Sequence, residues 1–381
     1  MKMEEKEFKE YLSLSKKVEE DFLGTEMEPE DNDDVQDDVP YNVQDIRVDQ
    51  KMITVYQVEH WIELGMLNLS PEYQRNLVWD NKRKSALIES LLLRIPIPAF
   101  YLDEGEDGIK NVIDGMQRLS TIHDFLNDKF SLSRMQYLSG CEKKKFSQLD
   151  IKFRSRIEET ALAVNILDER CPQMVKFDVF RRVNTGGVPL NPQEIRNIMA
   201  KPEVRLLLRE MACSNEFREV TKGKIKDVRM GAQELCLRYL TILFNYDWGK
   251  KEFDKYLGLL KMMDSTILDL NTMTSEQRDV ILKKFKNVLF QCKIVLKELS
   301  FCKLDNNKIN KSLFTSWAVA LSFLNIENEV LERKAELIKS VYMKHLSGGS
   351  EFYESITSST GTKKNVHIAL ETIRNIIEDC I

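Results

Sequence analysis

Residues 113–121, with the sequence IDGMQRLST, decide the fold of this 381-residue chain. The apolar run 111–113 that leads into them predicts a strand. Apolar residues recur at helical spacing at positions 119, 122, 125 and 126, so a helix is expected to begin near Met116. An Asp-Gly pair between two such segments is typical of a tight turn. The stretch therefore predicts a strand, a glycine turn and a helix start in direct succession.

These three parts are what a phosphate-binding turn needs. The first backbone N–H groups of a helix have no partner within it, and the helix dipole favours negative charge there. Gly115 would let a ligand approach the backbone closely, and Arg118 would add a planar cation suited to phosphate oxygens. The simpler interpretation is an ordinary turn, in which Asp114 caps the helix and Arg118 lies in solvent.

Composition indicates a globular protein without a membrane span. The hydrophobic share is 43%, and no apolar run is long enough to cross a bilayer. The first ten residues are highly charged, which argues against a secretory signal. Seven cysteines are scattered without a CxxC pair, and four histidines lie far apart, so we expect reduced thiols, no local zinc site and a cytoplasmic location.

Charge is distributed unevenly along the chain. Residues 1–40 carry five lysines and fifteen acids, which leaves the remainder with a net charge of +5 although the whole chain carries −5. The acids are densest over 26–38, and such a self-repelling block is expected to be disordered. Two roles remain open for it: a solvating tail, or a mask over a basic surface of the folded body.

The order of the predicted elements favours an α+β protein in three parts. Residues 1–40 would hold a short amphipathic helix over 3–23 and the acidic segment. Residues 41–170 would form a small mixed sheet with helices, and residues 171–381 a helical domain. Helices are predicted after the caps Thr54 and Asp80, and strands over 97–102, 109–113 and 162–167. Later helices are predicted over 232–246, 252–263, 275–299, 311–325, 329–345 and 364–379.

Two further polar stretches accompany the glycine turn. Residues 70–79 gather aromatic, amide and guanidinium groups just before the helix capped by Asp80. Residues 181–187 place two arginines before a Gly-Gly pair, ahead of a helix with Asn191 as its cap, Pro192 at its first position and Glu194 at its third. A loop at the edge of the core would explain the first stretch equally well, and an ordinary helix C-cap the second.

Taken in order, these stretches resemble a known family. The chain carries PEYQRNLVW at 71–79, ALIESLLLRIPIPAFYL at 86–102, IDGMQRLSTI at 113–122 and FRRVNTGGVPLNPQEIRN at 180–197. Over about residues 50–200 it resembles the N-terminal domain family of GmrSD-type restriction systems, whose hallmark is an Asp-Gly-Gln-Gln-Arg motif. That family is similar to the ParB/sulfiredoxin fold, in which an arginine-bearing turn at a helix start holds nucleotide phosphates.

The resemblance implies a set of site residues. It implies a ParB/sulfiredoxin-like nucleotide-binding domain followed by helices. Because only hard oxygen ligands are on offer at the turn, an ion bound with the nucleoside triphosphate is expected to be Mg²⁺, and no residue is assigned as a metal ligand. The resemblance assigns a catalytic role to Asp114, Gln117 and Arg118, and a nucleotide- or phosphate-binding role to Tyr73, Gln74, Arg75, Gly115, Asn184, Thr185 and Gly186.

The chain departs from the family pattern in two ways. Met116 stands where the hallmark has its first glutamine, and methionine offers no hydrogen-bond donor, so hydrolysis could weaken while binding survives. Two-part relatives also carry a histidine-rich, metal-dependent nuclease domain of the HNH type. Only His345 and His367 lie late in this chain, so we expect no built-in HNH nuclease domain.

The leading functional hypothesis is a nucleotide-binding regulatory protein of a restriction or phage-defence system. Whether it is an enzyme that hydrolyses the nucleotide stays open, and a separate nuclease subunit is an expected partner. The alternatives are a DNA-binding module without turnover, or a phosphodiesterase that nicks DNA with the same motif. The DNA-binding alternative rests on the basic stretch 143–156 and on a second cluster: Arg218, Lys222, Lys224, Lys226 and Arg229. Either could instead be a solvated charged face.

Overall fold

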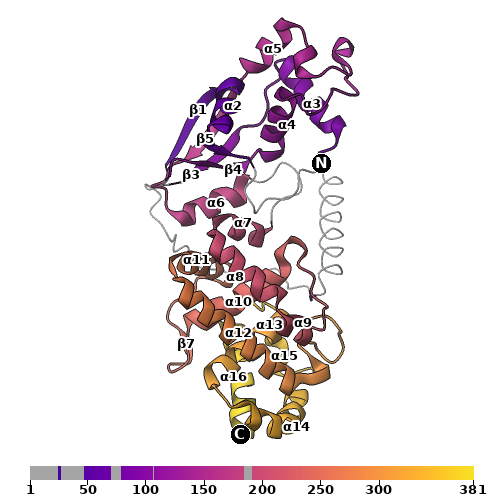
Figure 1. Ribbon diagram of the computed structural model, residues 1–381. Helices are drawn as coiled ribbons and strands as arrows, with labels where there is room; N and C mark the ends of the chain where they lie inside the picture. The colour runs from indigo at the N-terminus through magenta and orange to yellow at the C-terminus, as the bar shows by residue number, and fades with distance from the viewer. Residues whose placement is uncertain (1–24, 27–46, 70–78, 106, 184–190) are drawn as a thin grey trace. The chain divides into compact units, whose positions relative to one another are not determined.

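The computed structural model describes residues 25–26, 47–69, 79–105, 107–183 and 191–381, and they divide into two compact units (Figure 1). One unit spans Val39–Ile198 and contains the main sheet. The other joins Met199–Ile381 with the N-terminal residues. Of the described residues, 61% are helical and 10% lie in strands, which confirms the α+β prediction of a mixed sheet with helices followed by a helical part.

The main sheet has five strands in the order β1-β5-β3-β4-β2. Their bounds are Val48–Thr54 for β1, Leu67–Asn68 for β2, Phe100–Glu104 for β3, Lys110–Asp114 for β4 and Ala161–Leu167 for β5. The pairs β1–β5 and β3–β4 are antiparallel, whereas β3–β5 and β2–β4 are parallel. The sheet is therefore mixed, and β3, β4 and β5 lie where strands were predicted.

Strand β1 was not predicted from the sequence. Its sequence, VDQKMIT, lacks the alternation of apolar and polar residues that indicates a half-buried strand, and only Ile53 in it is fully buried. It is an edge strand that pairs over all seven residues with β5. Because most of its side chains are exposed, the backbone ladder places it in the sheet.

The helices of the mixed unit begin at the predicted caps. Thr54 accepts from Gln57 N at 3.2 Å ahead of α2 (Val55–Glu63), and Asp80 accepts from Arg83 N at 2.9 Å ahead of α3 (Asn81–Leu92). Next come α4 (Met116–Leu126) and α5 (Ile151–Glu158). These helices and the sheet share one core, which includes Ile88, Phe100 and Phe125, none of them exposed to solvent.

Two helices past the expected boundary at residues 170/171 belong to the mixed unit. They are α6 (Gln173–Val183) and α7 (Pro192–Met199), and the compact unit extends to Ile198. An ion pair fastens α6 to the sheet, since Lys176 Nζ lies 2.5 Å from Asp103 Oδ1 of β3. The predicted capping of α7 is confirmed: Asn191 N donates to Glu194 Oε2 at 2.8 Å, and Glu194 N to Asn191 Oδ1 at 2.7 Å.

The second unit is nearly all helical. Its longer helices are α8 (Pro202–Cys213), α10 (Gly231–Asn245), α11 (Leu259–Thr272), α12 (Ser275–Leu296), α13 (Lys311–Leu324), α14 (Asn328–His345) and α16 (Lys363–Cys380), and its short ones are α9 (Asn215–Val220) and α15 (Glu351–Ser355). The helix predicted over 252–263 was wrong in its first half. There β7 (Glu252–Phe253) pairs with β6 (Tyr246–Asp247), and α11 begins only after Gly258, whose φ is +84°.

Part of the N-terminal segment is docked on the helical unit. Thr25 forms a parallel bridge with Ile309, and Glu26 N donates to Ile309 O at 2.9 Å. The Glu26 carboxylate accepts from Asn310 Nδ2 at 2.8 Å and lies 3.2 Å from Lys303 Nζ. The acidic stretch 26–38 was expected to be disordered, but its first residue, Glu26, is held by these contacts. The rest of that stretch and the helix expected over 3–23 lie outside the described residues. Thr25 and Glu26 show that a truncation of residues 1–40 would also remove packed contacts.

Candidate functional site

The predicted strand–glycine–helix turn is present between β4 and α4. Strand β4 ends at Asp114, Gly115 has φ +99°, and α4 starts at Met116. A Cβ on Gly115 would lie 2.3 Å from Cδ1 and 2.8 Å from Cε1 of the Phe100 ring. Only glycine therefore satisfies both the left-handed backbone and the close approach to Phe100. As the N-cap, Gly115 supplies no side-chain cap to the first turn of α4.

Asp114 and Arg118 form an ion pair across this turn. Arg118 Nη2 lies 2.8 Å from Asp114 Oδ2, and the two side chains are only 12% and 25% exposed, respectively. Arg118 also donates to the carbonyls of Pro98 and Ala99, and its guanidinium lies 4.5 Å from the centroid of the Phe100 ring. Arg118 thus ties the start of α4 to the chain entering β3, in contrast to the solvated side chain of the simpler interpretation.

Burial disfavours the charge on both partners of this pair. Burial raises the pKa of Asp114 above its ordinary value, although Arg118 and the backbone N–H of Gly115 act in the opposite direction. Burial likewise lowers the pKa of Arg118, against the attraction of Asp114. Each ion therefore depends on the other, and removal of one would leave an uncompensated charge at a poorly solvated position.

Met116 points into the core of the mixed unit. Its residue is 8% exposed, it belongs to the main apolar cluster, and its sulfur accepts from Ser120 Oγ at 3.7 Å. The departure from the family motif thus falls on a side chain that packs inward. The structure places Met116 away from the surface at which a ligand would meet the turn.

Changing Met116 to glutamine is therefore expected to cost stability. The amide would enter an apolar environment where Ser120 is the available partner, and an unsatisfied buried amide costs about 1–3 kcal/mol. Chemical denaturation of Met116→Gln beside Met116→Leu, which keeps the volume, would measure the difference. If Met116→Gln proved at least as stable as Met116→Leu, the position would be more polar than the structure indicates.

Gln117 links the turn to the second polar stretch. Its Oε1 accepts from Trp79 N at 3.4 Å, so the last residue of the 70–79 stretch lies at the start of α4, as expected for a segment that faces the motif. Tyr73, Gln74 and Arg75 lie outside the described residues, and so do Asn184, Thr185 and Gly186 of the third stretch. Of the predicted site residues, the structure brings together Asp114, Gly115, Gln117 and Arg118.

Two polar pairs in the mixed unit, one around the buried Lys176 and one half-buried at His123, had no signal in the sequence. Lys176 is 2% exposed and is paired with Asp103, whose pKa is raised by burial against the attraction of Lys176. His123 Nδ1 lies 3.0 and 3.1 Å from the two oxygens of Glu59, which also accepts from Asn127 Nδ2 at 2.9 Å. Both pairs join residues more than sixty positions apart, which no local pattern relates.

Within 25–26, 47–69, 79–105, 107–183 and 191–381, no group of three or more His, Cys, Asp and Glu side chains is placed to hold a metal ion. None of the helices in that part of the chain is long and apolar enough to cross a membrane. All seven cysteines are free, and Cys213 alone among them is exposed.

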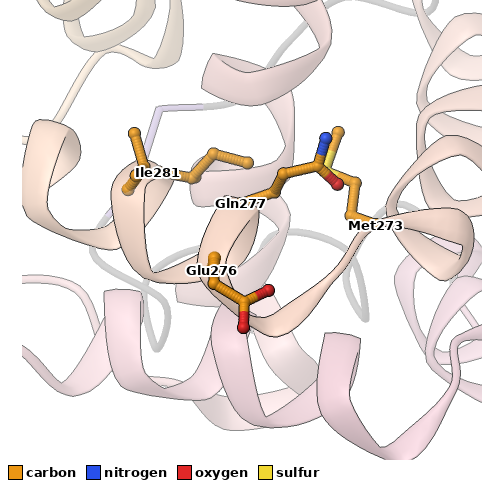
Figure 2. Close-up of a pocket in the computed structure, with 5 residues that line it drawn as sticks. Met273, Glu276, Gln277 and Ile281 are labelled. Atoms are coloured by element: carbon orange, nitrogen blue, oxygen red, sulfur yellow. The ribbon is translucent and has the colours of Figure 1, made fainter.

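A surface pocket lies on the helical unit at the start of α12 (Figure 2). It is lined by Met273, Glu276, Gln277, Val280 and Ile281, which belong to one helix and the turn before it. Gln277 also forms a capping box with Thr274. The polar groups here are thus explained in part by helix capping, and the site with convergent charged groups is the β4–α4 turn.

Comparison with known families agrees with the motifs. Residues 58–199 match the family described as the GmrSD restriction endonuclease, N-terminal domain. This match includes all three polar stretches and ends at the last residue of α7, next to the boundary of the mixed unit. Residues 58–199, most of the mixed unit, are thus similar to the N-terminal domain of GmrSD restriction endonucleases, as the motifs predicted. No curated protein matches the chain.

Proposed function

We propose that this protein is a nucleotide-binding regulatory component of a restriction or phage-defence system and that the β4–α4 turn binds the nucleotide phosphates. The observation that carries the proposal is the left-handed Gly115 between β4 and a helix start without a side-chain cap, next to a guanidinium. Helix starts of this kind favour anions through their N–H groups and dipole. The family match supports the restriction setting.

When phosphate binds at the turn, it would replace Asp114 as the partner of the Arg118 guanidinium. Arg118 neutralises Asp114 in the structure, and a phosphate arriving at the start of α4 competes for the same guanidinium. Asp114 then becomes available as a carboxylate beside the phosphate. Since its pKa is raised by burial, Asp114 is also a better proton acceptor than an ordinary aspartate.

Asp114 is also the residue that would hold Mg²⁺. Magnesium in nucleotide sites is bound by one or two carboxylates together with substrate phosphates, and it keeps several waters. A single carboxylate at the turn fits that mode of binding. Hydrolysis of the nucleotide would need the attacking water to be oriented as well, and Asp114 is the carboxylate at hand for that role.

The substitution Gln117→Glu tests phosphate binding at the turn while it keeps the fold intact. Arg118 is unsuitable for this purpose because its loss would also break contacts to Asp114 and to the chain entering β3. The glutamate has the same shape as glutamine, and a negative charge in the first turn of a helix is favourable to stability. It would repel phosphate, so we expect at least about tenfold weaker nucleotide binding with unchanged or higher thermal stability.

The measurement is calorimetric titration with each nucleoside triphosphate and Mg²⁺, supported by thermal shift. A ligand at a hundredfold excess over its dissociation constant should stabilise the wild type by about 2.7 kcal/mol. Gln277→Glu, in the first turn of α12, is the matched control and should bind as the wild type does. Equal affinity in wild type and Gln117→Glu would refute the assignment of the turn.

A further inference from the structure

The stretch 131–156, which runs from the loop after α4 into the first turns of α5, carries cations that form no ion pair in the described part of the chain. Residues 131–156 hold seven lysines and arginines against two acids, a net charge of +5. Arg134, Lys143, Lys145 and Lys152 are all exposed. Over the described part of the chain, no carboxylate lies within ion-pair distance of these four side chains. Tyr137, in the same loop, is 67% exposed.

The backbone of this loop is held in place by two carboxylates. Glu89 of α3 accepts from the N–H groups of Gln136, Tyr137 and Leu138 at 3.0, 2.7 and 2.9 Å. Glu142 accepts from the N–H groups of residues 134 and 135, both at 2.9 Å. Five consecutive N–H groups are thus satisfied internally, so the exposed side chains project from a fixed backbone.

Two of the cations occupy strained backbone positions. Arg134 and Lys143 have φ values of +55° and +61°, in the left-handed region where glycine is favoured. They lie on adjacent segments, because Lys143 N donates to Leu132 O at 2.8 Å and Glu142 binds the backbone of Arg134. Strain of this kind costs stability, and a substitution by glycine would relieve it.

The second basic cluster is different. Lys222 Nζ lies 2.9 Å from Glu298 Oε2, and Lys224 Nζ donates to the backbone and side-chain oxygens of Asn307 at 2.8 and 2.6 Å. These lysines fasten the loop after α9 to the chain ahead of α13. Lys222 and Lys224 are therefore bound by groups of the helical unit. In this they differ from the exposed cations of 131–156, although the two clusters look alike in sequence.

We infer that the stretch 131–156, through Arg134, Tyr137, Lys143, Lys145 and the α5 residue Lys152, binds the phosphate backbone of duplex DNA. The whole chain carries a net charge of −5, so attraction to a polyanion must come from a local surface such as this one. Duplex DNA presents phosphates at high linear density, and lysine, arginine and tyrosine side chains are common phosphate contacts. This surface is separate from the β4–α4 turn and needs no nucleotide there.

The test replaces the two strained cations with glycine. Arg134→Gly with Lys143→Gly removes two charges while it relaxes both left-handed positions, so the full-length double variant should be no less stable than the wild type. Its affinity for a short DNA duplex should fall about tenfold at low salt, and the slope of log K against log salt should decrease by about 2. Fluorescence anisotropy without nucleotide, at several salt concentrations, measures both quantities.

Lys222→Gly is the matched control. Lys222 is also left-handed, with φ +53°, but it is paired with Glu298, so its loss should leave DNA binding unchanged. Unchanged affinity and slope in the Arg134→Gly, Lys143→Gly protein would overturn the proposal. A tighter complex with RNA than with duplex DNA would overturn the choice of partner. Because no nucleotide is present, failure here is distinguishable from failure of the nucleotide site.

Discussion

Replacing Gly115 with alanine is expected to destabilise the mixed unit by about 2–5 kcal/mol, the sum of a left-handed backbone penalty and a steric clash. The backbone penalty follows from the φ of +99°. The clash follows from the Phe100 ring, whose nearest carbon lies 2.3 Å from where the new Cβ would be. Phe100 is fully buried, so its ring has little room to move aside.

Gly65→Ala is the control for the backbone contribution. Gly65 also has a positive φ, +70°, but nothing lies within 4 Å of a Cβ built on it. It should therefore show only the backbone penalty of about 1–2 kcal/mol. Urea denaturation monitored by the fluorescence of Trp61 and Trp79, in the mixed unit, would compare the variants. If Gly65→Ala and Gly115→Ala lowered the free energy of unfolding equally, Phe100 would not restrict the turn.

Replacing Glu89 with glutamine is expected to destabilise the mixed unit by about 2–4 kcal/mol. Glu89 is 6% exposed, and its two oxygens accept from three consecutive backbone N–H groups. Glutamine has one oxygen, and its NH₂ group would face an N–H donor. The loop that carries Tyr137 should loosen as well, so DNA affinity should fall together with stability.

The same carboxylate predicts a pH dependence. Burial alone would raise the pKa of Glu89, but the backbone N–H groups of Tyr137, Gln136 and Leu138 together hold it below its ordinary value of 4.5. The stabilisation is therefore present above the ordinary pKa and is lost as pH falls through the lowered pKa of the folded protein. Unfolding of wild type and Glu89→Gln should be followed from neutral to acidic pH.

The difference in the free energy of unfolding between wild type and Glu89→Gln should become smaller as the pH becomes acidic. Glu142→Gln is the companion variant, because Glu142 accepts from two N–H groups of the same loop and is less buried. It should lose less stability than Glu89→Gln. If the difference in the free energy of unfolding between wild type and Glu89→Gln stayed constant with pH, the charge of Glu89 would not stabilise the loop.

Features that depend on near neighbours could be predicted from the amino-acid order alone. The strand, the left-handed Gly115 and the start of α4 follow from apolar spacing and an Asp-Gly pair. The caps at Thr54, Asp80 and Asn191 follow from side chains that bond to N–H groups three residues later. The order of the motifs was also sufficient to identify the family that residues 58–199 match.

Contacts between distant groups could not be predicted in this way, because they form only when the chain packs. Strand β1 has no apolar alternation and exists because β5 offers it a full backbone ladder. Lys176 is buried because Asp103, 73 positions earlier, neutralises it. Lys143 and Lys222 look alike in sequence, yet Glu298, 76 positions away, neutralises Lys222 alone. Pairing across such separations depends on how the chain packs, whereas capping and periodicity depend on residues within one turn of each other.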